Sequence, residues 1–325
     1  MPCKRIGIMS TCSSPDGYAL ERKIFEDDDV EIVGIGNLEE LEKVRSGLSA
    51  LIIGNARVTA EAVRDMPLCS VICRHGQGVD NIDVEEASRH GIKVCNVPGF
   101  NTEEVSDHAL AFALMLARNI PFYNDTVKND RIWKYSSYPA NIRVSEMTLG
   151  LLGFGRIAQR LASKATSLFG RIATYDPWVD RAAANRLGVE VLGGIDDLLG
   201  CADVLSIHIP LTDDTHHLIG AETLAKMKRT AYLVNCSRGG IVDAEALNDA
   251  LDKGALAGAA VDVIEPEPAP HDYILYDQRK CVVTPHVAWY SSSAFRQMRQ
   301  EAAESAIRAL RGEMPACCLN ADCLK

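Results

Sequence analysis

Three side chains suited to acid–base chemistry on a small anion follow predicted strands in the second half of the chain: Arg238, Glu267 and His286. Because open α/β sheets bind ligands at the carboxyl ends of their strands, we expect the three to form one site. An arginine can hold a carboxylate through two hydrogen bonds. A carboxylate neighbour raises the pKa of a histidine, which can then donate a proton near neutral pH. This set suits the reduction of a 2-keto acid.

Other residues compete for two of these roles. Glu265 precedes Glu267 by two positions and is its alternative. His286 is favoured as the acid because it lies beyond the last predicted strand of its domain. The alternatives to it are His208, His216 and His217.

A glycine motif predicts the cofactor. Gly153-x-Gly155-x-x-Ala158 follows an apolar strand and opens a helix, the setting in which the motif binds a dinucleotide. Gly153 permits a tight turn, and Gly155 lets the backbone approach the pyrophosphate. Asp176 lies about 20 residues on, where a carboxylate accepts bonds from ribose hydroxyls and repels a 2′-phosphate. The motif therefore favours NAD over NADP.

Short apolar runs alternate with helix-length amphipathic segments along the whole chain, which is the pattern of parallel α/β sheets. The fold class we predict is two Rossmann-like or flavodoxin-like α/β domains with doubly wound parallel sheets and a cofactor cleft between them. The predicted strands span residues 5–9, 31–35, 50–53, 71–74, 93–96, 148–152, 171–175, 189–191, 204–208, 231–235, 257–261 and 281–284.

A helix is predicted over residues 102–119, with Pro121 as its stop. Residues 109–116 are apolar nearly all round, so more than one face must be covered. The cover is another domain or, as we favour, a second subunit. Residues 120–148 are expected to form an irregular arm. A long helix over 292–311 follows the second sheet and is able to return to the first domain.

Composition excludes some partners. The net charge is -10 and the sequence pI is about 5.3, which disfavours nucleic acid and anionic membranes because no basic excess exists to bind them. No apolar stretch reaches the roughly 18 residues that span a bilayer. We expect a cytoplasmic protein that contacts neither nucleic acid nor membrane.

Eleven cysteines are present, without a C-x-x-C pair. The odd count favours free thiols in a reducing compartment. No metal site is predicted, and a site at Cys317, Cys318 and Cys323 is a minor alternative because spacing alone is weak evidence.

At these motifs the chain resembles the D-isomer-specific 2-hydroxyacid dehydrogenase family, which includes phosphoglycerate dehydrogenases and the C-terminal-binding corepressors. The corepressor branch has a similar Ala-Trp-Tyr run and tail. The matching stretches are 74–83 (RHGQGVDNID), 94–98 (VCNVP), 149–158, 208–212 (HIPLT), 235–243 (NCSRGGIVD), 262–268 and 284–290 (TPHVAWY).

The resemblance implies Arg238, Glu267 and His286 as the catalytic set and a homodimer as the assembly. It implies a discontinuous substrate-binding domain of residues 1–97 plus 290–325, and an NAD-binding Rossmann domain of residues 98–289. The implied cofactor contacts are Gly153, Gly155, Arg156, Ile157, Asp176, His208, Pro210, Thr215, Cys236, Ser237 and Asp262. The implied substrate contacts are Arg74, Gly76, Gln77, Gly78 and Trp289.

Departures from phosphoglycerate enzymes suggest another substrate. Asn55 lies where those enzymes often carry an arginine, and Tyr135 occupies the position of an expected subunit-crossing arginine, although Arg57 or Arg131 could compensate. Trp289 would give an apolar wall. We expect an unphosphorylated 2-keto acid with an apolar or thioether side chain. The alternative is an NAD(H)-sensing, partner-binding scaffold of the corepressor type with little turnover.

Overall fold

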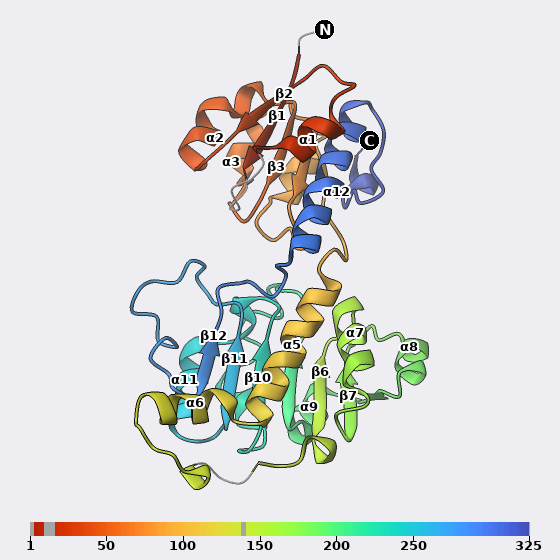
Figure 1. The fold of residues 1–325 in the computed structure, drawn as a ribbon. Coiled ribbons are helices and arrows are strands. Elements are labelled where there is room, and N and C mark those ends of the chain that lie inside the picture. The colour runs from red at the N-terminus through yellow and green to blue at the C-terminus, as the bar shows by residue number, and fades with distance from the viewer. Residues whose placement is uncertain (1–2, 10–16, 138–140, 325) are drawn as a thin grey trace. The chain divides into compact units, whose positions relative to one another are not determined.

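The computed structural model describes residues 3–9, 17–137 and 141–324. Contacts divide the chain into two compact units. Unit 1 comprises Met1–Phe100 and Ser291–Lys325, and unit 2 comprises Asn101–Tyr290. Each unit contains one parallel β-sheet with helices packed around it (Figure 1). Among the described residues, no helix is both long enough and apolar enough to cross a bilayer.

Unit 1 has a five-stranded sheet in the order β2-β1-β3-β4-β5, the flavodoxin-like order. The central strands β3 and β4 are buried at every residue, because helices cover both faces of a parallel sheet. The strands are β1 Lys4–Met9, β2 Val30–Gly34, β3 Ala50–Ile53, β4 Val71–Arg74 and β5 Lys93–Cys95. The helices are α1 Ala19–Ile24, α2 Leu38–Val44, α3 Ala60–Arg64, α4 Val84–Arg89 and α12 Ser292–Leu310, with 3-10 turns at Arg45–Gly47 and Ala321–Cys323.

The C-terminal helix α12 completes unit 1. Ser291 caps its first turn by accepting a hydrogen bond from the amide of Ala294. The helix packs on α1, β3 and β4, which come from the other end of the chain. Its Arg299 forms a buried, two-bond ion pair with Glu21 of α1, with Nε 2.7 Å from Oε1 and Nη2 2.5 Å from Oε2. Both side chains are less than 10% exposed, so the pair lies in the interior.

Unit 2 has a seven-stranded sheet in the order β12-β11-β10-β9-β6-β7-β8. The strand order starts at β6, runs outward through β7 and β8, and then continues from β9 on the other side of β6, which is the Rossmann arrangement. The strands are β6 Thr148–Leu152, β7 Arg171–Tyr175, β8 Glu190–Val191, β9 Val204–Ile207, β10 Tyr232–Asn235, β11 Gly258–Val261 and β12 Cys281–Val283. The predicted fold class, two α/β domains with doubly wound parallel sheets, is confirmed.

The remaining elements of unit 2 cover this sheet. The helices are α5 Thr102–Ala117, α6 Ile120–Lys128, α7 Arg156–Ala165, α8 Arg181–Arg186, α9 Ile195–Cys201, α10 Ala221–Leu224 and α11 Ala244–Asp252. Three 3-10 turns lie at Tyr135–Ser137, Val144–Glu146 and Gly239–Ile241.

One expectation for this unit was wrong. Residues 120–128 are helix α6 rather than part of an irregular arm, because Pro121 lies in the first turn of a new helix, where proline is tolerated. The left-handed Asn119, with φ 53°, separates α5 from α6. Much of α5 is covered by its own unit, since the helix packs on α7, β9, β10 and β11. Leu110, Leu114 and Met115 are only half-buried, so their cover by a second subunit stays a prediction.

Candidate active site

The glycine turn after β6 has the geometry that its motif predicts. Gly153 has φ +91°, and a Cβ there would lie 2.8 Å from the carbonyl oxygen of His208, so only glycine fits. Gly155, in contrast, faces open space and is the N-cap of α7. Arg156 is exposed and Ile157 is half-buried. The turn thus leaves the first amides of α7 accessible to a pyrophosphate, which fits a dinucleotide.

Asp176 directly follows β7 and has a structural task that the sequence did not reveal. Its Oδ2 accepts a hydrogen bond from the amide of Phe154 at 2.8 Å, inside the glycine turn. Its Oδ1 accepts one from the amide of Trp178, also at 2.8 Å. Because each carboxylate oxygen has a second lone pair, Asp176 can still accept a bond from a ribose hydroxyl.

The strand β9 leads into His208, whose environment keeps it neutral. Burial lowers the pKa of His208 to about 4, and its Nε2 lies 2.9 Å from the hydroxyl of Ser206. A group that stays neutral at pH 7 is unsuited to donate the proton, so His208 is excluded as the general acid.

The low pKa of His208 predicts acid sensitivity of unit 2. The unfolded chain, with a histidine pKa near 6.5, takes up a proton that the folded chain resists down to about pH 4. Stability is therefore lost as the pH falls from 6.5 towards 4, by about 2 kcal/mol at pH 5. Urea unfolding followed by tryptophan fluorescence should show this loss in the wild type. His208→Gln should reduce it, and an unchanged pH dependence in that variant would contradict the assignment.

One hydrogen bond stabilises the loop after β9, and another joins it to the loop after β10. Thr215 donates its hydroxyl to the carbonyl of Pro210 at 2.7 Å. Ser237 donates its hydroxyl to the carbonyl of Ile209. Burial, together with the charge of Asp262, raises the pKa of the Cys236 thiol, which therefore stays protonated.

His286 and Glu267 form a hydrogen-bonded pair in the loops that follow β12 and β11. Nδ1 of His286 lies 2.7 Å from Oε2 of Glu267, and the side chains are 27% and 32% exposed. Burial alone would raise the pKa of Glu267, but the hydrogen bond and charge of His286 and the charge of Arg238 lower it overall. The carboxylate therefore stays ionised and partners the imidazole. The other imidazole nitrogen, Nε2, is left for a proton exchange.

Asp262, at the end of β11, holds the backbone on which His286 lies. Its carboxylate is 1% exposed and accepts bonds from the hydroxyl of Thr284 and from the amides of Val287 and Ala288. Its carbonyl accepts the amide of His286 at 2.7 Å. These bonds hold His286 at φ 52°, a conformation that is uncommon outside glycine. No sequence signal marks this task, since any backbone amide can be the donor.

The competing residues form a separate cluster. Glu265 contacts both His216 and His217, whereas Glu267 contacts His286. The structure thus brings the histidines and glutamates together in two sets.

Arg238 follows β10 and donates from Nη1 to the carbonyl of Ser237 at 2.8 Å. The amide group of Asn235 donates to the carbonyl of Arg238 at 2.9 Å and shapes that turn.

The predicted substrate contacts of unit 1 follow β4. Arg74 is buried, and its guanidinium donates to the side-chain oxygen of Asn55 at 2.7 Å and to the carbonyl of His75. A Cβ on Gly76 would collide with that guanidinium. Burial and the charges of Arg74 and Arg299 lower the pKa of His75 to about 3, so His75 is neutral. Through its bonds to Asn55 and to the carbonyl of His75, Arg74 supports the loop that continues through Gln77 and Gly78.

Trp289 lies in unit 2, three residues after His286, and is half-buried, with its ring edge-on to Tyr290 at 5.3 Å between centroids.

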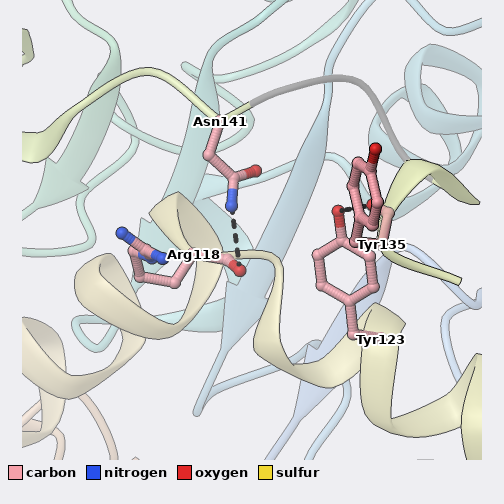
Figure 2. Close-up of a pocket in the computed structure, with 4 residues that line it drawn as sticks. All are labelled: Arg118, Tyr123, Tyr135 and Asn141. Atoms are coloured by element: carbon pink, nitrogen blue, oxygen red, sulfur yellow. Dashed lines mark hydrogen bonds between the residues drawn. The ribbon is translucent and has the colours of Figure 1, made fainter.

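A separate cavity of about 520 Å³ lies along α5 and α6 (Figure 2). It is lined by Arg118, Tyr123, Tyr135 and Asn141. Asn141 donates to the carbonyl of Arg118 at 3.2 Å, and Tyr123 donates to the carbonyl of Tyr135 at 2.8 Å. Helix α6 packs at the amino end of β11, so this cavity lies away from the strand ends that carry His286.

The fold and the glycine turn define a dinucleotide-binding protein of the doubly wound α/β class. Residues 110–288 match the family model described as D-isomer specific 2-hydroxyacid dehydrogenase, NAD binding domain. The chain belongs to the D-isomer-specific 2-hydroxyacid dehydrogenase family, as the sequence predicted, and NAD is confirmed as the cofactor.

Relatives agree with this assignment. The chain is 36% identical over 294 residues to D-3-phosphoglycerate dehydrogenase of Methanocaldococcus jannaschii, covering 90% of this chain and 56% of that protein. It is 37% identical over 288 residues to glyoxylate reductase of Korarchaeum cryptofilum, covering 88% and 86%. The chain thus spans only about half the length of the phosphoglycerate dehydrogenases that it matches.

Solved structures share the fold. The structure of D-lactate dehydrogenase from Aquifex aeolicus, complexed with NAD and lactic acid, has a TM-score of 0.84 at 25% identity, covering 95% of this chain and 96% of that one. A protein from Thermus thermophilus has a TM-score of 0.84 at 34% identity, covering 97% and 99%.

Proposed function

We propose that this chain is an NAD-dependent dehydrogenase that interconverts a 2-keto acid and a D-2-hydroxy acid. The observation that carries the proposal is the 2.7 Å contact between His286 and Glu267, at the carboxyl ends of strands in an NAD-binding domain. This contact supplies a proton donor for a carbonyl oxygen. The fold alone would not indicate a reaction.

Each member of the catalytic set has one task. NADH, when bound, supplies the hydride for the carbonyl carbon. His286 gives the proton at Nε2 to the carbonyl oxygen and takes it back in the reverse reaction. Glu267 balances the charge of the protonated imidazole through Nδ1. Arg238 binds the substrate carboxylate and polarises the carbonyl.

The residues around the glycine turn would hold the cofactor. Gly153, Gly155 and the amides of Arg156 and Ile157 would receive the pyrophosphate, and Asp176 the ribose hydroxyls. The negative charge of Asp176 disfavours NADP, because it would repel the 2′-phosphate. The other contacts that we propose are His208, Pro210, Thr215, Cys236, Ser237 and Asp262.

The substrate is proposed to be unphosphorylated. Arg74 is the charged residue among the implied substrate contacts, but it is buried and donates to Asn55 and the His75 carbonyl. We assign Arg74 to positioning the loop whose Gly76, Gln77 and Gly78 would bind the substrate carboxylate through their backbone. The half-buried Trp289 would contact an apolar or thioether side chain.

The proposal is tested by measuring NADH oxidation with a panel of 2-keto acids. The same reactions with NADPH in place of NADH are the control. The panel contains hydroxypyruvate, glyoxylate, pyruvate, 2-ketoisocaproate, 4-methylthio-2-oxobutyrate and 3-phosphohydroxypyruvate. We expect turnover with NADH and a preference for an unphosphorylated acid. Preference for 3-phosphohydroxypyruvate would contradict the substrate class. No turnover with any acid, despite NADH binding, would favour the partner-binding scaffold instead.

The assembly is proposed to be a homodimer. Large apolar side chains lie exposed around α6 and the segment after it, including Trp133 at 90% and Tyr135 at 91% exposure. Ile120, Ile132 and Ile142 are also exposed. Several large exposed apolar side chains in one segment of the chain favour an interface there. Sedimentation equilibrium should give twice the chain mass of 35.4 kDa, and a single-chain mass would contradict the proposal.

A further inference from the structure

Two adjacent histidines and a glutamate form a cluster that the proposed reaction does not use. Within the part of the chain that the structure describes, His216, His217 and Glu265 are the only group of at least three His, Cys, Asp or Glu residues whose ligand atoms all lie within 4.8 Å of one another. Sequence spacing does not reveal the cluster, because His216 and Glu265 are 49 residues apart.

Both histidine nitrogens lie at about the ligand spacing of a coordination site from the carboxylate oxygen of Glu265. Nε2 of His216 lies 3.1 Å from Oε2 of Glu265, and Nε2 of His217 lies 3.4 Å from the same oxygen. Two ligands at about 2.0–2.1 Å from a tetrahedral zinc ion are about 3.3–3.4 Å apart. To bind one ion, the two imidazole rings would rotate out of their stacked arrangement, so that both Nε2 lone pairs point at the ion.

The backbone directs both imidazoles to one place. Neighbouring side chains on an extended chain point in opposite directions, but His217 has φ 52°. The two rings are consequently stacked, with centroids 4.0 Å apart and planes 19° apart. The amide of His217 donates to the carbonyl of Gly240 at 2.7 Å and anchors this turn.

Gly240 also makes room for the glutamate. A Cβ on Gly240 would lie 2.8 Å from Oε1 of Glu265, so the missing side chain allows the carboxylate to approach the histidines. The side chains of the cluster are 45–47% exposed. Solvent can thus reach the site and provide a further ligand.

We propose that His216, His217 and Glu265 bind one transition-metal ion through two imidazole nitrogens and one carboxylate oxygen. Imidazole ligands favour Zn²⁺, Ni²⁺ and Cu²⁺ over Mg²⁺ and Ca²⁺, which prefer oxygen. A bound ion would link the loop that follows Thr215 to the loop that contains Glu267. The ion is separate from the proton transfer assigned to His286.

The test is Zn²⁺ binding to the full chain, prepared without a polyhistidine tag and stripped with chelator. The comparison is the triple variant His216→Gln/His217→Asn/Glu265→Gln, in which asparagine tolerates the left-handed backbone. Both proteins contain the same cysteines, so the difference in bound zinc reports the cluster alone. We expect the wild type to bind one more zinc ion per chain than the triple variant, and zinc to raise the Tm of the wild type only.

Single variants make the test sharper. His216→Gln should weaken this zinc site at least about tenfold, while the exposed His271→Gln should leave it unchanged. Mg²⁺ at equal concentration should not displace the zinc. Equal zinc stoichiometry and affinity in the wild type and the triple variant would overturn the proposal. So would a loss of the site in His271→Gln as large as that in His216→Gln.

Discussion

Replacing His286 by glutamine should lower kcat for keto acid reduction by about 10²–10⁴-fold, the usual contribution of a positioned general acid. Glutamine keeps hydrogen-bonding groups at the end of the side chain but has no proton to transfer. Asp262 should keep the loop in place through the backbone amides of residues 286–288 and the hydroxyl of Thr284, and NADH binding reports any strain of glutamine at φ 52°. Steady-state rates with saturating NADH and the preferred keto acid measure the effect.

Two controls separate chemistry from structure. His271→Gln removes an exposed histidine from the same unit and should keep the wild-type rate. NADH binding by His286→Gln, followed by fluorescence titration, should stay within about twofold of the wild type because the glycine turn is untouched. A variant that retains more than a tenth of the wild-type kcat would refute the role of His286.

The Glu267→Gln variant should change how the rate of keto acid reduction depends on pH. The lowered pKa of Glu267 means that its carboxylate persists at acid pH, where it favours the protonated imidazole. Without the carboxylate, reduction should begin to slow at a lower pH than in the wild type, so the loss of rate is larger at pH 8 than at pH 6. Equal losses at both pH values would indicate that Glu267 only supports the loop.

The second large effect concerns stability. Arg299→Met should reduce the free energy of unfolding of unit 1 by about 3–5 kcal/mol, because it leaves the carboxylate of Glu21 buried without its partner. Glu21 is 1% exposed, so water cannot replace the guanidinium. The double variant Glu21→Leu/Arg299→Met should recover most of the loss, since it removes both charges together.

The positions of the tryptophans allow this loss to be located. All three, Trp133, Trp178 and Trp289, belong to unit 2. Urea unfolding followed by far-ultraviolet circular dichroism should show an early transition in Arg299→Met, while tryptophan fluorescence should shift less. Each transition would be fitted separately, because a protein of two units need not unfold in one step. A double variant as unstable as Arg299→Met would show that lost packing, rather than the unpaired charge, causes the effect.

The sequence by itself determined the elements and the cofactor, because these depend on local patterns. Short apolar runs and helix-length amphipathic segments predicted strands and helices close to their observed positions. Gly153 and Gly155 could be interpreted because the phosphate turn needs glycine at fixed neighbouring positions. Helix α6 was missed because Pro121, a stop signal for one helix, is also tolerated in the first turn of the next.

Only the tertiary structure decided which charged groups become partners. The choice between Glu265 and Glu267 as the neighbour of His286 depends on how the loops after β9, β11 and β12 fold at one edge of the sheet. The pair Glu21 and Arg299 forms across 278 residues because α12 packs against α1. Such contacts leave no periodic signal in the sequence, since they require only that two distant side chains reach each other after the chain has folded.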